Sequence, residues 1–289
     1  MNSEKTKKPL SRRSKAHLII LAVTILLFII ELVRSNSYIE VESFEYKNDK
    51  LPQGFDGARI VSVTDYHNHG GSYEDKLIEK IKAQTPDYIF LVGDIIDSTF
   101  TKLDVQKSFL EKCAKVAPCF LVYGNHEQRL SSEQKSKYLE NAKQAGVTVL
   151  DNEIVPLTRN GDTLYLVGTS SMGGFIDVEE QAKVLDKSAP LLWIHHYPEN
   201  FKEISQESQS IGFGSMLLFC GHAHGGLIRI PFTGIGVVAP GQGLLPEYTG
   251  GEYFEGDDEM LLSRGCGNSG VTRRFFDPFE IVVCELKAG

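Results

Sequence analysis

Residues 217–226 read LLFCGHAHGG, an apolar run followed by two histidines that a single residue separates and that glycines flank. The run 217–220 has the composition of a buried strand. In an extended chain residues i and i+2 point to the same side, so His222 and His224 can both reach one cluster of side chains. Two imidazoles alone hold a metal ion weakly. This segment therefore predicts a metal site whose other ligands come from elsewhere in the chain.

Polar side chains also follow apolar runs in the first half of the chain, at 58–64, 88–92 and 119–123. The residues after these runs are Asp65 and His67, Asp94 and Asp97, and Asn125 and His126. The steps from Asp65 to Asp94 and from Asp94 to Asn125 are each about thirty residues, the length of one β-α-β unit. Because the carboxyl ends of parallel strands meet at one edge of a sheet, we expect these side chains to lie close together.

The periodicity of the remaining chain predicts the fold class. Helices are expected over 73–83, 102–116 and 178–185. Further strands are expected at 147–150, 153–157, 163–167, 191–194, 217–220, 227–230, 260–263 and 279–286. These elements predict an α/β fold in which two β-sheets pack face to face as a sandwich flanked by helices.

The positions of the histidines favour one common site. A single aspartate after a strand more often caps a helix or forms a turn than binds a ligand. Of the eight histidines, however, six follow an apolar run closely, where random placement would scatter them. These six are His67, His126, His195, His196, His222 and His224.

The N-terminal part of the chain predicts a membrane anchor. A basic leader over 1–15 precedes an apolar run over 16–33, which as a helix would be about 27 Å long, close to the hydrocarbon thickness of a bilayer. The positive-inside rule places the leader in the cytoplasm and the rest of the chain outside it, at the cell membrane. A signal peptide that is cleaved after export is the alternative. A stalk and first strand over 34–57 and a catalytic domain over 58–289 are expected to follow.

Charge and cysteine content limit the partners. The net charge is −8 although the leader is basic, so the body of the chain is acidic and nucleic acid is not an expected partner. The five cysteines form no C-x-x-C pair. Cys113 and Cys119 could form a disulfide if the domain lies outside the cell, and would otherwise be small core residues.

The ordered motifs resemble those of the calcineurin-like metallophosphoesterase superfamily. They are D-x-H at 65–67, G-D-x-x-D at 93–97, G-N-H-E at 124–127, a later histidine, and G-H-x-H at 221–224. The resemblance extends from about residue 58 to 286. The closing segments 263–265 and 274–276 resemble the bacterial phosphodiesterase branch that is exported or membrane-anchored.

The resemblance implies a centre of two divalent metal ions, with Mn, Fe or Zn as candidates. One ion would be bound by Asp65, His67, Asp94 and His224, and the other by Asp94, Asn125, His196 and His222. His222 and His224 would thus serve different ions, with Asp94 as the bridge. His196 is preferred to His195 because the family pattern is His-x-Pro, here 196–198.

The same resemblance implies roles for other side chains. His126 would be the general acid, and Asp97 would orient neighbouring groups. Tyr66 could form a wall of the substrate pocket or pack at the strand end. Arg264 and Arg274 could each contact phosphate or form structural ion pairs.

The implied activity is hydrolysis of a phosphodiester or related phosphate ester, by attack of a hydroxide that bridges the two metal ions. The anchor would also allow a lipid-borne phosphate ester as the substrate. The alternatives are a non-catalytic, metal-dependent binding module on the same fold and, among enzymes, a lipid-linked pyrophosphatase.

Overall fold

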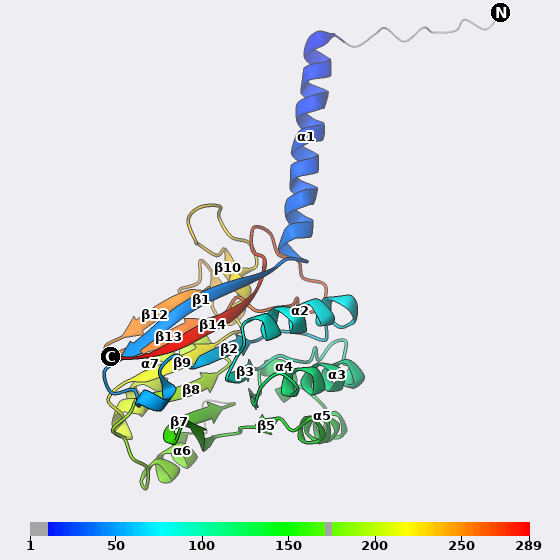
Figure 1. The fold of residues 1–289 in the computed structure, drawn as a ribbon. Coiled ribbons are helices and arrows are strands. Elements are labelled where there is room, and N and C mark those ends of the chain that lie inside the picture. The colour runs from blue at the N-terminus through cyan, green and yellow to red at the C-terminus, as the bar shows by residue number, and fades with distance from the viewer. Residues whose placement is uncertain (1–10, 171–174) are drawn as a thin grey trace, which may run out of the picture.

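Two six-stranded β-sheets pack face to face between layers of helices in the computed structural model, which describes residues 11–170 and 175–289 (Figure 1). The first sheet has the order β1-β14-β2-β3-β4-β5. Its strands are β1 (Ile39–Asn48), β14 (Phe279–Ala288), β2 (Arg59–Val63), β3 (Tyr88–Val92), β4 (Cys119–Val122) and β5 (Thr148–Val149). β2 to β5 are parallel, and the connections between them run through α2 (Gly71–Ala83), α3 (Leu103–Ala114) and α5 (Ser132–Ala145). The predicted β-α-β units are therefore present.

The second sheet has the order β12-β13-β9-β8-β7-β6. Its strands are β12 (Gly251–Glu255), β13 (Asp258–Leu262), β9 (Met216–Cys220), β8 (Leu191–His195), β7 (Asp162–Thr169) and β6 (Glu153–Arg159). The four inner strands, β7, β8, β9 and β13, are parallel. Helices α6 (Phe175–Ala182) and α7 (Phe201–Ser210) pack on its outer face. The predicted α/β sandwich flanked by helices is confirmed.

The shorter elements connect these layers. They are η1 (Gln53–Phe55), α4 (Asn125–Gln128), η2 (Pro198–Asn200), η3 (His224–Gly226), β10 (Val238–Ala239) and β11 (Gly243–Leu244). Among the strands that the structure describes, β10 and β11 pair only with each other. α4 and η3 begin at the strand ends that carry predicted ligands, so they bend the chain at the candidate site.

The strands of the first sheet are buried on both faces. Val61 and Leu91 pack against α2, α3 and α5, while Ile60 and Phe90 belong to the core between the two sheets. Successive residues of a strand point to opposite faces, so a strand covered on both sides must be apolar at nearly every position. This explains why these strands appear in the sequence as unbroken apolar runs.

The N-terminal helix α1 (Arg12–Ser35) projects away from the sandwich (Figure 1). Its 24 residues are long and apolar enough to cross a membrane, and the predicted run 16–33 lies within it. Residues 1–10 lie outside the described residues, and with them most of the expected basic leader. Residues 36–38 alone separate α1 from β1, so the expected stalk is reduced to a short link.

The strand predicted at 227–230 is wrong. Residues 224–226 form η3, and Gly225 and Leu227 have φ angles of 65° and 55°, which are incompatible with an extended strand. Ile228 makes only an isolated bridge to Phe275. The glycines that follow the histidine pair therefore reverse the chain away from the sheet.

The cysteines are free thiols. All five are buried, and Cys113 on α3 and Cys119 on β4 are not bonded to each other. Both belong to the core between the first sheet and its helices. The alternative of a Cys113–Cys119 disulfide is not realised, and the reading as small core residues is confirmed.

Candidate metal centre

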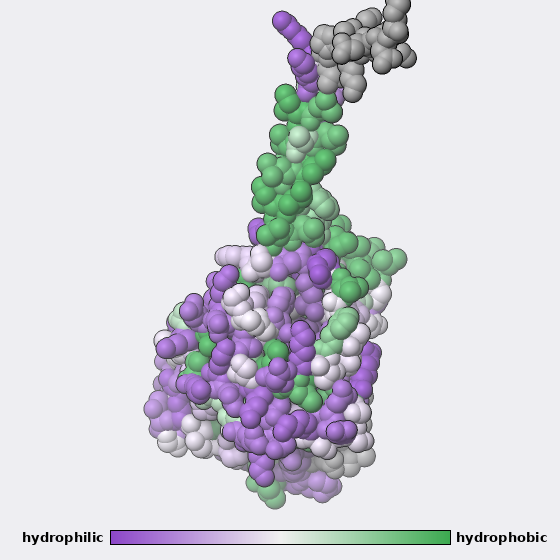
Figure 2. Space-filling view, turned by 90° about the vertical axis from the view of Figure 1, so that its right-hand side faces the viewer, coloured by the Kyte–Doolittle hydropathy of each residue, from purple (hydrophilic) through white to green (hydrophobic). Residues whose placement is uncertain are grey.

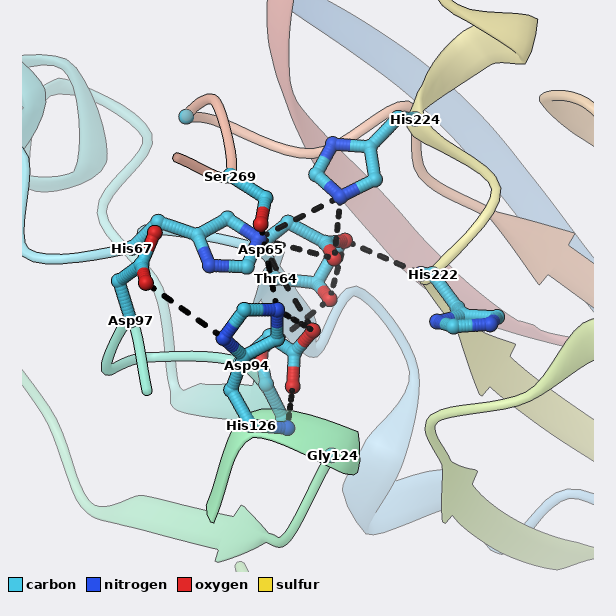
Figure 3. Close-up of polar contacts among 12 residues, drawn as sticks. Thr64, Asp65, His67, Asp94, Asp97, Gly124, His126, His222, His224 and Ser269 are labelled. Carbon is cyan, nitrogen blue, oxygen red and sulfur yellow. Dashed lines mark hydrogen bonds and ion pairs between the residues drawn. The ribbon is translucent and has the colours of Figure 1, made fainter. Parts of the chain in front are cut away.

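The predicted ligand residues meet at one edge of the sandwich, where Figure 3 shows Asp65, His67 and Asp94 close to His224. β2, β3 and β4 of the first sheet and β8 and β9 of the second all end at this edge. The strand ends bring together Asp65, His67, Asp94, Asn125, His196, His222 and His224. All of these except Asn125 are buried. Five strands from two sheets therefore place carboxylate, amide and imidazole groups in a single cluster.

The two carboxylate oxygens of Asp65 have different surroundings: one accepts hydrogen bonds that fix the side chain, and the other faces the histidines. Oδ2 accepts hydrogen bonds from the Thr64 hydroxyl (2.8 Å) and from the backbone N–H of His222 (3.1 Å). Oδ1 lies 3.3 Å from Nε2 of His224 and 3.8 Å from Nε2 of His67. The two sheets thus fix the direction in which this carboxylate presents its free oxygen.

Asp94 has the same arrangement. Its Oδ1 accepts a hydrogen bond from the backbone N–H of His126 (2.8 Å), and its Oδ2 lies 3.3 Å from Nε2 of His196 and 3.9 Å from Nε2 of His67. Nδ1 of His196 lies 2.8 Å from the carbonyl oxygen of Val92, to which it can only donate. This bond places the lone pair of the neutral ring on Nε2, as metal-binding histidines require.

The side chains form two adjacent groups whose donor atoms could each surround one ion. In one group the donor atoms of Asp65, His67 and His224 lie within 4.8 Å of one another, and the other group joins Asp94, His196 and His222 in the same way. His222 and His224 thus fall into different groups. A third group of the same kind joins His67, Asp97 and His126.

The unpaired atoms at this edge fit a cation. Oδ1 of Asp65, Oδ1 of Asn125 and Nε2 of His196 are buried and have no hydrogen-bond partner among the described residues. An unpaired buried polar atom costs about 1–3 kcal/mol, which coordination to an ion would offset. Carboxylate and amide oxygens mixed with imidazole suit Mn, Fe or Zn. The residues present therefore fit the divalent metals expected from the sequence.

The electrostatics of the cluster also favour cations. Burial opposes ionisation of both aspartates, but the surrounding histidines hold the pKa of Asp65 and Asp94 below its usual range. Burial lowers the pKa of His222 to about 4 and that of His224 to about 3. Burial would also lower the pKa of His196, but Asp94 and Asp65 raise it to about 10. A bound cation would displace that proton.

The backbone is strained at the candidate ligands. Asp65, His67, Asp94, His222 and His224 have φ angles of 54°, 49°, 52°, 68° and 47°. Left-handed conformations cost a non-glycine residue about 1–3 kcal/mol and persist where the surrounding structure imposes them, most often at functional sites. The fold therefore imposes backbone strain at the residues whose side chains converge on one point.

Two glycines of the sequence motifs are required by close packing. A Cβ atom on Gly221 would lie 2.0 Å from Thr64 Oγ1, and one on Gly124 would lie 2.2 Å from Oδ1 of Asp94. Both contacts are far shorter than van der Waals distances, so any larger residue would displace the aspartates. This explains the glycine before the histidine pair and the glycine before Asn125.

Comparison with known proteins identifies the family. Residues 58–226 match the sequence model of the calcineurin-like phosphoesterases. The chain belongs to this family. The match covers more than half of the chain, and its ends enclose every candidate ligand described above.

Bacterial and vertebrate proteins resemble this phosphoesterase over most of its length. The metallophosphoesterase YkuE of Bacillus subtilis (strain 168) is 29% identical and covers 86% of each chain. Phosphodiesterase YaeI of Escherichia coli (strain K12) is 28% identical over 70% of this chain and 71% of its own. A transmembrane protein with a metallophosphoesterase domain from Danio rerio is 24% identical over 92% of this chain and 62% of its own.

Glu127 supports the cluster of this phosphoesterase from beneath. Its buried carboxylate accepts hydrogen bonds from the backbone N–H groups of Asp94 (2.9 Å), Gly124 (2.9 Å) and Ile96 (3.1 Å). It thereby fixes the loop that carries Asp94 relative to the turn that carries Asn125. Glu127 lies within the G-N-H-E motif, but the motif alone does not indicate this supporting role.

His126 lies beside the candidate ligand groups and faces a cleft. Ser98 N–H donates to its Nδ1 (2.9 Å), so the proton of the neutral ring lies on Nε2, which is 4.0 Å from Oδ2 of Asp94 and 3.2 Å from the hydroxyl of Ser269. Burial lowers the pKa of His126. Asp97 accepts from three backbone N–H groups and lies 3.8 Å from Nδ1 of His126. It therefore orders the loops around the ring.

The cleft has a volume of about 660 Å³ and opens directly over the ligand groups. Its inner wall includes Asp94, Asn125, His126, His222 and His224. Its outer wall includes Gln128, Arg129, Tyr197, Pro240, Gly241 and Thr272. A phosphate ester that enters the cleft would therefore meet the candidate metal ligands and His126 together.

His195 lies outside the metal cluster. Its Nδ1 lies 2.9 Å from the carbonyl oxygen of Thr169 and its Nε2 lies 2.9 Å from Nδ2 of Asn200. Both ring nitrogens are thus engaged with structural partners. The structure separates this ring from His196, whose Nε2 faces Asp94.

The two arginines and Tyr66 have structural contacts. Arg264 pairs with Glu280 and lies 2.7 Å from a Glu40 carboxylate oxygen, and the fully buried Arg274 lies 3.5 Å from Asp277. The hydroxyl of Tyr66 donates to Glu74 (2.7 Å), and its ring stacks on Phe109. None of the three lines the cleft. The ion-pair and packing interpretations are therefore the correct ones.

Proposed function

We propose that this chain is a membrane-anchored phosphoesterase that hydrolyses a phosphodiester or related phosphate ester with two divalent metal ions. The observation that carries the proposal is the pair of adjacent ligand groups, in which an Asp65 oxygen and a His196 nitrogen are buried without hydrogen-bond partners among the described residues. The similarity to YaeI, a protein described as a phosphodiesterase, supports a diester as the substrate.

The ligand assignment follows the two groups. Asp65, His67 and His224 would hold one ion, His196, His222 and Asn125 the other, and Asp94 would bridge them. The position of Asp94 supports bridging, because its Oδ2 lies within 4 Å of histidines from both groups. When bound, a pair of such cations supplies an acidified water as the nucleophile and neutralises phosphate oxygens.

His126 is the proposed proton donor. Its Nε2 faces the cleft, and its Nδ1 is held by Ser98 at the rear. In its protonated form, in which Nδ1 can donate to the Ser98 hydroxyl (3.0 Å), the ring would hand its Nε2 proton to the oxygen that leaves phosphorus and return to the neutral state. General acid catalysis of this kind contributes about 10²- to 10⁴-fold to the rate.

The proposed anchor is α1, with its N-terminus in the cytoplasm and the catalytic domain outside it. The last turn of the helix is built into the domain: Ser35 is fully buried and accepts a hydrogen bond from the backbone N–H of Asp277 (3.2 Å). Asn36 bonds to both backbone groups of Arg274. These contacts favour a retained helix over export followed by cleavage, and the transmembrane relative from Danio rerio supports the same conclusion.

The full chain, purified in detergent, tests the proposal with bis(p-nitrophenyl) phosphate in Mn²⁺, Zn²⁺ or Fe²⁺. We expect turnover that chelation abolishes and metal restores, with two ions per chain by elemental analysis. Asp94→Asn is the inactive control. Two bound ions with no turnover on diesters, monoesters or pyrophosphates would instead identify a metal-dependent binding module.

A further inference from the structure

Exposed apolar side chains gather where α1 leaves the domain. They lie on the loop that follows η3, at the end of β11 and on the loop that follows β13. They include Ile230, Phe232, Ile235, Leu244, Leu245 and Val271, the residues of what we call the apolar collar. Phe232 is fully exposed, and Leu244 and Val271 are 78% and 83% exposed. Figure 2 shows apolar atoms beside the base of the apolar helix, above a mostly hydrophilic domain. Contiguous exposed apolar groups of this kind mark contact with a protein or a membrane.

A contact between two aromatic rings shows which part of α1 lies level with the apolar collar. Phe275, which belongs to the same loop as Val271, packs against Phe28 of α1 with ring centroids 4.9 Å apart. Phe28 lies five residues before Val33, the end of the apolar run, which corresponds to about 7.5 Å along a helix. If α1 crosses a bilayer, the loop around Phe275 must therefore lie within its boundary region.

The charges near the apolar collar fit a lipid surface. Residues 227–246 contain no Asp or Glu and a single charge, Arg229, although the whole chain has a net charge of −8. Residues 267–276 are also free of acidic side chains and contain the exposed Arg273, whereas Arg274 is fully buried beside Asp277. Basic side chains beside an apolar surface are attracted to anionic lipid head groups, whereas the acidic remainder of the domain would be repelled.

We propose that the apolar collar is a second membrane contact, which inserts into the bilayer surface beside α1 and makes the catalytic cleft open there. The inference rests on the proposed anchoring role of α1. Leu227, Pro240 and Thr272 line the cleft and belong to the loops that carry the collar. A phosphate group on a lipid could therefore reach the cleft while its acyl chains stay in the bilayer.

Tryptophan variants of the full chain test this inference without any assay of hydrolysis. Phe232→Trp and Leu245→Trp report on the apolar collar, and Leu26→Trp on α1 reports on the anchor. Val184→Trp is the control, because Val184 is 87% exposed just after α6, at the end of the domain away from α1 (Figure 1). The native Trp193 is fully buried, so its signal serves as a constant baseline.

Each variant is reconstituted into vesicles of phosphatidylcholine and phosphatidylglycerol, with brominated or ordinary acyl chains. We expect brominated lipid to quench Phe232→Trp and Leu245→Trp several-fold more strongly than Val184→Trp. We also expect iodide, a quencher dissolved in the water, to quench these two variants less than Val184→Trp, which is iodide protection. Iodide access equal to that of Val184→Trp would overturn the inference in favour of a solvent-exposed surface. Iodide protection without lipid quenching would overturn it in favour of a protein partner or a second copy. Failure of Leu26→Trp to be quenched would refute the anchor and the collar together, while leaving the hydrolytic function to its own assay.

Discussion

Nη2 of Arg274 lies 3.0 Å from Nδ1 of His224, so a guanidinium positions the last histidine of the G-H-A-H segment. Arg274 is fully buried, and its side chain also donates to the carbonyl oxygen of Gly267 (2.8 Å). Its backbone is bonded to the side chain of Asn36, directly after α1. A single residue therefore links the end of the proposed anchor to a candidate metal ligand.

Replacement of Arg274 should destabilise the fold and change the metal affinity. In Arg274→Met the guanidinium that faces Asp277 and His224 is lost. Breaking a buried ion pair costs about 3–5 kcal/mol. Metal affinity should change as well, because a guanidinium only donates and so holds the proton of the neutral His224 ring on Nε2, the nitrogen that faces Asp65. Thermal unfolding and metal titration measure the two effects. The exposed neighbour in Arg273→Met is the control, and metal affinity equal to wild type in Arg274→Met would contradict the positioning role.

The adjacent histidines of residues 195–196 should behave differently. His196→Ala removes a nitrogen that faces Asp94, so we expect loss of one of the two metal ions and loss of turnover. His195→Asn keeps polar groups near Thr169 and Asn200 and should retain both ions, with only a modest fall in stability. Elemental analysis of the two purified variants distinguishes them. If His195→Asn lost an ion and His196→Ala kept both, the ligand assignment would have to be exchanged.

Much of this site could be predicted because its chemistry lies at strand ends. A strand that is buried on both faces is an unbroken apolar run, and the first polar residue after it must lie at the sheet edge. Asp65, Asp94 and Asn125 could therefore be placed together from their spacing alone. The order of the motifs, rather than any single residue, indicated the family.

Other features depend on contacts that sequence patterns do not reveal. α5 exposes most of its length and has a capping box at Ser131 and Gln134 but few apolar residues, so it shows little periodicity. The role of Arg274 depends on Asn36 and His224, which lie 238 and 50 positions away in the chain. The left-handed conformation of His222 and His224 is imposed by tertiary packing, against the intrinsic preference of histidine.

Replacement of His126 should lower turnover without loss of bound metal. Its backbone N–H, rather than its ring, bonds to Asp94, so His126→Ala leaves that hydrogen bond in place. We expect two bound ions and a fall in kcat of about 10²- to 10⁴-fold. A substrate with a good leaving group such as p-nitrophenolate should lose less than an alkyl ester, because it needs less protonation. Equal losses on both substrates would contradict proton donation by His126.

The thiols should be unreactive in the folded protein. All five cysteines are buried and free, and burial raises the pKa of Cys113, Cys220 and Cys266. The thiolate is the reactive form, so we expect a thiol reagent such as DTNB to label the native chain slowly and the denatured chain at all five positions. Reducing agent should leave the melting temperature unchanged. A fall in melting temperature on reduction would reveal a disulfide.

Glu42 should make the stability of the domain fall as pH rises above about 5. Burial and the neighbouring Glu280 raise the pKa of Glu42 from 4.5 to about 8, although Arg264 acts in the opposite direction. Between these pH values the folded chain keeps a proton that the unfolded chain has lost, so the unfolded state gains relative stability as pH increases. Glu42→Gln cannot ionise and should therefore melt progressively higher than wild type as pH goes from 5 to 8, with a constant difference above that range. Glu45→Gln, an exposed change on the same strand, is the control. Parallel melting curves for wild type and Glu42→Gln across this range would show that Glu42 ionises normally in the folded chain.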